Sequence, residues 1–136
     1  MNVQTYLFFD GECETALDFY CGALGAEVIC LVRYKDGPAE LMPPGGEVKI
    51  FHATMRIGDT LINCSDDLRH ERGRFGGFVL LAHLDGDEAA EEVFHALSDG
   101  GKVEMALQKT FWASRYGIVT DRFGVTWKVQ SSDLAA

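Results

Sequence analysis

The chain has 136 residues, 47% of them hydrophobic, which is enough for one domain with a substantial core. Its formal net charge of −9 argues against nucleic acid and anionic membrane surfaces as partners, because both require a basic surface. The N-terminal region has no basic segment followed by a long apolar stretch, and no apolar run approaches the length of a membrane span. The sequence therefore predicts a cytoplasmic protein that binds neither nucleic acid nor membrane.

Hydrophobic periodicity in the first half of the chain predicts one helix and four strands. The helix has the clearest pattern, since its apolar residues recur on one side and Gly25 provides a natural C-terminal stop. Gly58-Asp59 provides the turn between the last two strands. In chain order, the expected elements are strand 5–9, helix 14–24, strand 26–34, strand 51–57 and strand 60–65.

The second half of the chain predicts the same order of elements. Asp87 and Glu88 suit the start of a helix, which should end before Gly100-Gly101. The sequence Asp-Arg-Phe-Gly at 121–124 predicts a turn between the last two strands, because glycine adopts a positive φ readily. The expected elements are strand 78–84, helix 87–98 and strands 103–108, 116–121 and 125–130.

Several residues recur at a constant offset of 75 positions, which indicates an internal duplication. The loop over 36–47 and the connector over 66–74 are too short to separate two independent domains. We therefore predict a single domain over 1–136 made of two modules, about 1–66 and 75–131. The recurring pairs are Asp10-Gly11 with Asp85-Gly86, Phe19 with Phe94, Gly25 with Gly100, and Val28 with Val103.

Ordered motifs over nearly the whole chain resemble one family. They include Phe9-Asp10-Gly11, the helical run ALDFY at 16–20, the run HATMRIGD at 52–59, and GGKVEMALQKTFWASRYGIVTDRFGVTWKV at 100–129. On these motifs the chain resembles the PhnB-like members of the vicinal oxygen chelate superfamily, which includes glyoxalases and bleomycin-resistance proteins. The resemblance implies an α+β fold of two βαβββ modules. Their strands would form a curved mixed sheet, with helices outside and ligands in the concave cup.

Strand alternation predicts which side chains face that cup. In strand 51–57 the apolar residues Phe51, Ala53, Met55 and Ile57 should meet a helix, which leaves His52, Thr54 and Arg56 in the cup. In the last strand Val125, Trp127 and Val129 should pack outward, which leaves Thr126, Lys128 and Gln130 inside.

A family-like motif, Phe111-Trp112-Ala113, would approach the cup mouth together with Arg115 and Tyr116. Trp112 has an equal alternative role as an anchor in the core or in a dimer interface. Several cations in an acidic protein favour a small organic ligand with an anionic group, such as a carboxylate or phosphonate. The predicted ligand-binding residues are His52, Arg56, Trp112, Arg115, Tyr116 and Lys128.

The resemblance also implies three positions where metal-dependent relatives hold a divalent ion, and here these fall at Thr5, Val79 and Lys128. A hydroxyl, an apolar side chain and an ammonium do not make a ligand set. No metal and no cofactor are therefore predicted. The histidines at 52, 70, 83 and 95 have no metal-binding spacing, although His52 and His83 could both face the cup near Asp85 or Glu104. The cysteines at 13, 21, 30 and 64 have no such spacing either, and they are expected to be buried reduced thiols.

Two functions remain open. The first is a metal-free binding protein that holds a small organic molecule, and the second is a lyase or isomerase of the glyoxalase type in which a metal or His52 activates a proton. Some PhnB-like sequences have a name that suggests ubiquinone methylation, but no glycine-rich loop for S-adenosylmethionine follows the first strand. Methyl transfer is therefore disfavoured. A homodimer is expected, because relatives commonly close the cup with a two-fold partner.

Overall fold

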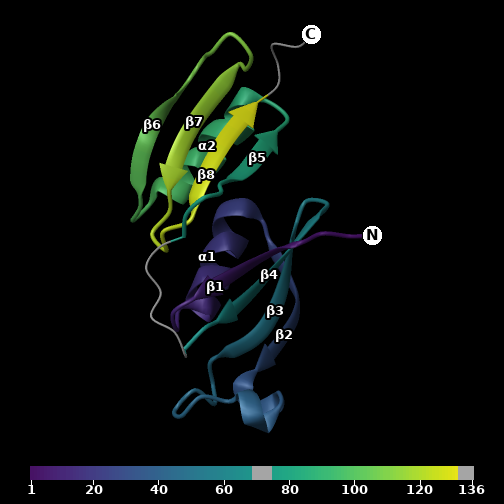
Figure 1. Cartoon of the computed structure of the whole chain (residues 1–136). Helices are drawn as coiled ribbons and strands as arrows, with labels where there is room; N and C mark the ends of the chain where they lie inside the picture. The colour runs from purple at the N-terminus through teal and green to yellow at the C-terminus, as the bar shows by residue number, and fades with distance from the viewer. Residues whose placement is uncertain (69–74, 132–136) are drawn as a thin grey trace. The chain divides into compact units, whose positions relative to one another are not determined.

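The computed structural model describes residues 1–68 and 75–131, and it divides the chain into two compact units, 1–72 and 73–136 (Figure 1). We call the described parts of these units the first and the second module, and we describe each by itself. Each module contains one α-helix and a four-stranded sheet, as the duplication predicts. The expected α+β fold of two βαβββ modules is thereby confirmed.

The first module has the sheet order β1-β4-β3-β2. Strand β1 pairs in parallel with β4, whereas β3 pairs antiparallel with both β4 and β2. The segment between β2 and β3, where the sequence predicts a loop over 36–47, contains two short 3-10 helices, η1 (Tyr34–Asp36) and η2 (Ala39–Leu41). The elements are β1 (Thr5–Phe9), α1 (Cys13–Leu24), β2 (Glu27–Arg33), β3 (Ile50–Ile57) and β4 (Thr60–Asp66).

The second module repeats this topology with the order β5-β8-β7-β6, in which β5 pairs in parallel with β8. Strand β7 pairs antiparallel with β6 and β8. Gly117 of β7 lies at the position that Ala53 occupies in β3, as the register of each strand with its neighbour shows. The elements are β5 (Leu80–Leu84), α2 (Asp87–Ser98), β6 (Lys102–Gln108), β7 (Arg115–Thr120) and β8 (Thr126–Ser131).

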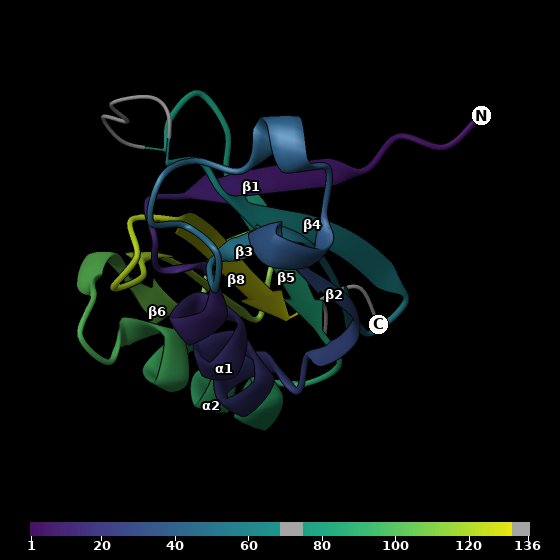
Figure 2. The ribbon, with the colours of Figure 1, turned by 90° about the horizontal axis from the view of Figure 1, so that it is seen from below.

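Each helix packs against one face of its own sheet, as Figures 1 and 2 show. The alternation predicted for β3 and β8 is confirmed: Ala53, Met55 and Val129 are completely buried, and Trp127 is 3% exposed. We call the opposite side of each sheet its open face. Its residues include Tyr6, Phe8, His52, Thr54, Arg56 and Asn63 in the first module, and Leu81, His83, Tyr116, Ile118, Lys128 and Gln130 in the second.

Buried carboxylates fix the ends of several elements. Asp66, 1% exposed at the end of β4, accepts the backbone N–H groups of Cys13 at 2.9 Å and Ile50 at 3.0 Å, so it caps the first turn of α1 and holds β3 beside it. Asp121, 3% exposed, accepts the indole N–H of Trp127 at 2.9 Å. It also accepts two backbone N–H groups of the predicted β7–β8 turn, where Gly124 has a φ of 93°.

The ends of the two helices differ. Gly25 caps α1 in the left-handed conformation with a φ of 66°, as the sequence predicts. Helix α2 ends at Ser98 with Asp99 in extended conformation, and the left-handed residue Gly100 follows it. Neither helix, within the ranges described, is long and apolar enough to cross a membrane.

All four cysteines are free thiols, but only Cys13 and Cys64 are buried, and Cys30 is exposed. The expectation that all would be buried is wrong, because Cys30 lies on the edge strand β2, whose side chains are mostly exposed. A hydrogen bond with Cys64, and burial, raise the pKa of the Cys13 thiol well above its usual range. Cys13 therefore stays protonated, and the two buried cysteines contribute to the core as small apolar side chains do.

Candidate functional site

A row of hydrogen bonds crosses the open face of the first module from β1 to β3 and β4. The Tyr6 hydroxyl lies 2.7 Å from His52 Nδ1, and His52 Nε2 lies 3.1 Å from Thr54 Oγ1. Thr54 donates to Asn63 Oδ1 at 2.8 Å, and the amide nitrogen of Asn63 donates to Gln4 at 2.9 Å. Both nitrogens of His52 are thus engaged within the sheet.

Tyr6 and Phe8 place two aromatic rings beside this row. The rings stack with centroids 5.0 Å apart and planes 18° apart, and the residues are 41% and 38% exposed. Partial burial, followed by the neighbouring thiols Cys64 and Cys13, raises the pKa of Tyr6 above its usual value, so its hydroxyl stays protonated. Neither Tyr6 nor Asn63 was predicted as a site residue, although alternation along β1 and β4 places both on this face.

Arg56, the second predicted site residue of the first module, forms an ion pair with Glu27 of β2. The side chain of Arg56 is 49% exposed, and that of Glu27 is 63% exposed. The charge of Arg56 is therefore largely compensated by its neighbour in the sheet. Its assignment as a ligand-binding residue stays a prediction.

In the second module, three of the predicted site residues come together. The Lys128 ammonium lies 5.9 Å from the centroid of the Tyr116 ring, within the range of a cation–π interaction. Trp112 packs edge-on against the same ring at 5.0 Å, and Phe111 packs against Trp112 at 4.8 Å. Trp112 is 48% exposed, so it is not a core residue.

Arg115 does not join this group. Adjacent residues in a strand point to opposite faces, and Arg115 points to the helix side, where it lies 3.4 Å from Asp87 and 3.4 Å from Glu91 of α2. Arg115 therefore does not share a face with Tyr116, and its assignment as a ligand-binding residue stays a prediction. Asp87 also accepts the hydroxyls of Ser114 at 2.8 Å and Ser131 at 2.7 Å. These two bonds, ahead of Arg115, hold the pKa of Asp87 below its usual value.

The positions where the family implies a metal do not fit one. Thr5 lies on the helix side with the buried residues Leu7 and Phe9, Val79 precedes β5 and is apolar, and Lys128 is a cation. Within the described residues, no group of three or more histidine, cysteine, aspartate or glutamate side chains could hold a metal ion. Of the other candidates, Glu104 bonds to Thr120, and His70 lies outside the described residues.

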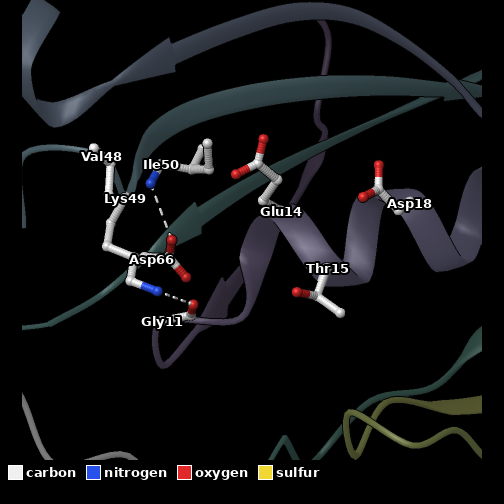
Figure 3. A pocket seen from close by; sticks show the side chains of 8 residues that line it. All are labelled: Gly11, Glu14, Thr15, Asp18, Val48, Lys49, Ile50 and Asp66. Carbon is white, nitrogen blue, oxygen red and sulfur yellow. Dashed lines mark hydrogen bonds between the residues drawn. The ribbon is translucent and has the colours of Figure 1, made fainter.

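A pocket of about 260 Å³ lies on the other side of the first module, at the start of α1 (Figure 3). Two of its charged groups already have partners in the protein: Asp66 holds two backbone N–H groups, and Lys49 donates to the carbonyl of Gly11 at 2.9 Å. The pocket contains none of the predicted site residues, and we assign it a structural role. Its lining residues are Gly11, Glu14, Thr15, Asp18, Val48, Lys49, Ile50 and Asp66.

The duplicated βαβββ fold, with polar and apolar side chains together on the open face of each sheet, defines a class of protein. The family model of the Glyoxalase/Bleomycin resistance protein/Dioxygenase superfamily matches residues 2–129, and the chain belongs to this superfamily. The chain is 36% identical to protein YjdN of Escherichia coli K12 over 95% of its own length and 94% of that protein.

Two solved structures are also similar. Protein PA1353 from Pseudomonas aeruginosa is 33% identical, with a TM-score of 0.88 over 97% of this chain and 98% of that one. The PhnB protein from Bacillus cereus, described as a putative 3-demethylubiquinone-9 3-methyltransferase, is 25% identical, with a TM-score of 0.84 over 97% and 100%. These similarities confirm the predicted family and its PhnB-like branch.

Proposed function

We propose that this protein binds a small organic molecule that has an anionic group and an apolar part, and that it does so without the metal used by metal-dependent relatives. One observation carries this proposal: Lys128 lies on an open face beside the ring of Tyr116, against which Trp112 packs. An ammonium attracts a carboxylate or phosphonate, and a half-exposed indole offers apolar surface next to it. Lys128 thus supplies positive charge at a position where metal-dependent relatives place a carboxylate ligand.

The alternative of a lyase or isomerase is supported less well. A general base needs a nitrogen free to take a proton from the substrate, and both nitrogens of His52 are bonded to Tyr6 and Thr54. The metal-dependent version needs a ligand set that the side chains at Thr5, Val79 and Lys128 do not provide. The fold of the two modules does not support methyl transfer either. Each four-stranded sheet has only one parallel pair of strands, and no glycine-rich nucleotide-binding loop follows β1 in the described residues.

The test compares the wild type with Lys128→Met, which keeps the length of the side chain and removes its charge. Calorimetric titration would use benzoate and phenylphosphonate as anionic probes and benzamide as the neutral one. We expect the variant to lose roughly tenfold in affinity for the anions, the value of one charge-assisted interaction, and to bind benzamide unchanged.

Lys102→Met is the matched control, because Lys102 belongs to the same module but pairs with Glu104 at 3.7 Å and is 78% exposed. It should bind all three probes as the wild type does. Equal affinities of the wild type and Lys128→Met for the anions would refute the proposal. An equal loss in both lysine variants would show that net charge, rather than Lys128, attracts the ligand.

Two further proposals from the sequence accompany this function: a homodimer and a cytoplasmic location. The homodimer is checked by sedimentation at micromolar concentration. A mass near that of the 15.0 kDa chain would exclude it.

A further inference from the structure

The hydrogen bonds of the first module determine which nitrogen of His52 bears the proton. The amide nitrogen of Asn63 lies 2.9 Å from the side-chain oxygen of Gln4 and 3.5 Å from the carbonyl of Thr5, so the amide oxygen is turned toward Thr54. Thr54 has one hydroxyl proton and gives it to that oxygen. The contact between Thr54 and His52 therefore requires His52 Nε2 to be the donor.

This assignment fixes the role of Tyr6. In the neutral imidazole with the proton on Nε2, Nδ1 has a lone pair, so it accepts the hydroxyl proton of Tyr6. The phenol oxygen then has no proton left to donate elsewhere, and its lone pairs remain available on the 41% exposed side chain. The raised pKa of Tyr6 agrees with a phenol that keeps its proton.

The ring platform beside this oxygen limits the shape of a ligand. Tyr6 and Phe8 lie nearly parallel, 18° apart, and both are about two-fifths exposed at 41% and 38%. Flat aromatic molecules pack favourably against such rings. An aromatic surface with one oriented polar atom is the combination that small-molecule sites use for affinity and orientation.

We propose that the open face of the first module binds a planar apolar ring that has an N–H or O–H donor, with the ring against Tyr6 and Phe8 and the donor on Tyr6 Oη. His52 is a positioning residue in this site: it holds the Tyr6 hydroxyl so that the oxygen acts as an acceptor. Thr54 and Asn63 set the tautomer of His52. The proposal depends on the first module only and does not require Lys128.

Indole and 1-methylindole are the probes, since they differ in the N–H group. Titrations followed by NMR would be made on the intact chain at pH 8. We expect the wild type to prefer indole by about fivefold, the value of one hydrogen bond. Tyr6→Phe keeps the ring and removes the oxygen, so this preference should disappear, whereas Lys128→Met should keep it.

A second readout tests the positioning role directly. Nitrogen NMR of the His52 ring should show the proton on Nε2 in the wild type. Thr54→Val is nearly isosteric and removes the acceptor, so it should mix the two tautomers and weaken the preference for indole. A proton on Nδ1 in the wild type, or equal affinities of the wild type for the two indoles, would overturn the proposal. Loss of the preference in Lys128→Met would place the binding in the second module and would also overturn it.

Discussion

The two modules have the same strand order, and their first, third and fourth strands pair in the same register, yet equivalent positions of their open faces have different chemistry. Asn63 faces Tyr6 across β4 and β1, and Lys128 faces Leu81 across β8 and β5. The first module thus has a neutral row of hydrogen bonds, whereas the second has an ammonium against aromatic rings. The backbone of a duplicated module is kept by its buried residues, which leaves the open face free to differ.

The attachment of each helix to its sheet shows a second difference. In the first module the carboxylate belongs to the strand, where Asp66 at the end of β4 accepts the Cys13 N–H of α1. In the second, the carboxylate belongs to the helix, where Asp87 of α2 accepts the hydroxyl of Ser131 at the end of β8. Because Asp87 also bonds to Ser114 and Arg115, the second attachment is shared among more partners and is less dependent on any one of them.

The largest loss of stability is expected when the attachment of the first helix is removed at Asp66. In Asp66→Ala the backbone N–H groups of Cys13 and Ile50 lose their acceptor while they remain buried, and we expect the free energy of unfolding to fall by about 3 kcal/mol. Ser131→Ala removes one hydrogen bond to a carboxylate that keeps other partners, so it should cost about 1 kcal/mol. Urea denaturation followed by circular dichroism measures both. Equal losses would mean that the two attachments are equivalent after all.

A smaller loss of stability is expected at Gly117 of β7, whose equivalent position in β3 of the first module is Ala53. A Cβ at Gly117 would lie 2.7 Å from Phe94 Cε2 and 3.0 Å from the Cα of Leu107, so Gly117→Ala forces the backbone or the ring to move. We expect a loss of about 2 kcal/mol in thermal or urea unfolding.

The matched control for this variant is Gly22→Ala in α1, where an added Cβ meets nothing within 4 Å. It should stabilise the protein by about 0.5–1 kcal/mol, because alanine favours a helix over glycine. A neutral Gly117→Ala would show that α2 packs against β7 more loosely than its contacts indicate.

The smallest change in stability is expected at the arginines that pair a strand with the helix of its module, Arg33 with Glu14 and Arg115 with Asp87. The Arg33 guanidinium, 2.6 Å and 3.1 Å from the Glu14 carboxylate, holds the pKa of Glu14 below its usual value. The pair therefore adds stability at neutral pH, and this contribution is lost as the pH falls through the lowered pKa. Arg33→Met should return the pKa of Glu14 toward its ordinary value in an NMR titration, with only a small change in stability because the pair is exposed.

Arg115→Met gives the contrast in the second module. The pKa of Asp87 should stay low in this variant, because hydrogen bonds from Ser114 and Ser131 contribute more than Arg115 does. If the pKa of Asp87 returned to its ordinary value, Arg115 rather than the two serines would be the main partner.

Local patterns were sufficient to predict most of the fold. Alternation and helical periodicity are set by neighbours in the sequence, and the expected strand 5–9 and helix 87–98 coincide with β1 and α2. The role of Asp66 could not be predicted, because its partner Cys13 lies 53 residues away. Arg115 and Tyr116 are neighbours in strand β7, so alternation gives their side chains opposite faces of the sheet. The hydrogen bond between Tyr6 and His52 could not be predicted either, because the two residues lie 46 positions apart in the sequence.

The chain contains two tryptophans, and their surroundings are opposite. Trp127 is 3% exposed with its indole N–H on the Asp121 carboxylate, whereas Trp112 is 48% exposed beside Tyr116. Iodide quenching should therefore distinguish their fluorescence: iodide in solution quenches the emission of the exposed Trp112 and does not quench that of the buried Trp127. The protein thus contains its own optical reporter at the open face of the second module, together with an internal reference in the core of the same module.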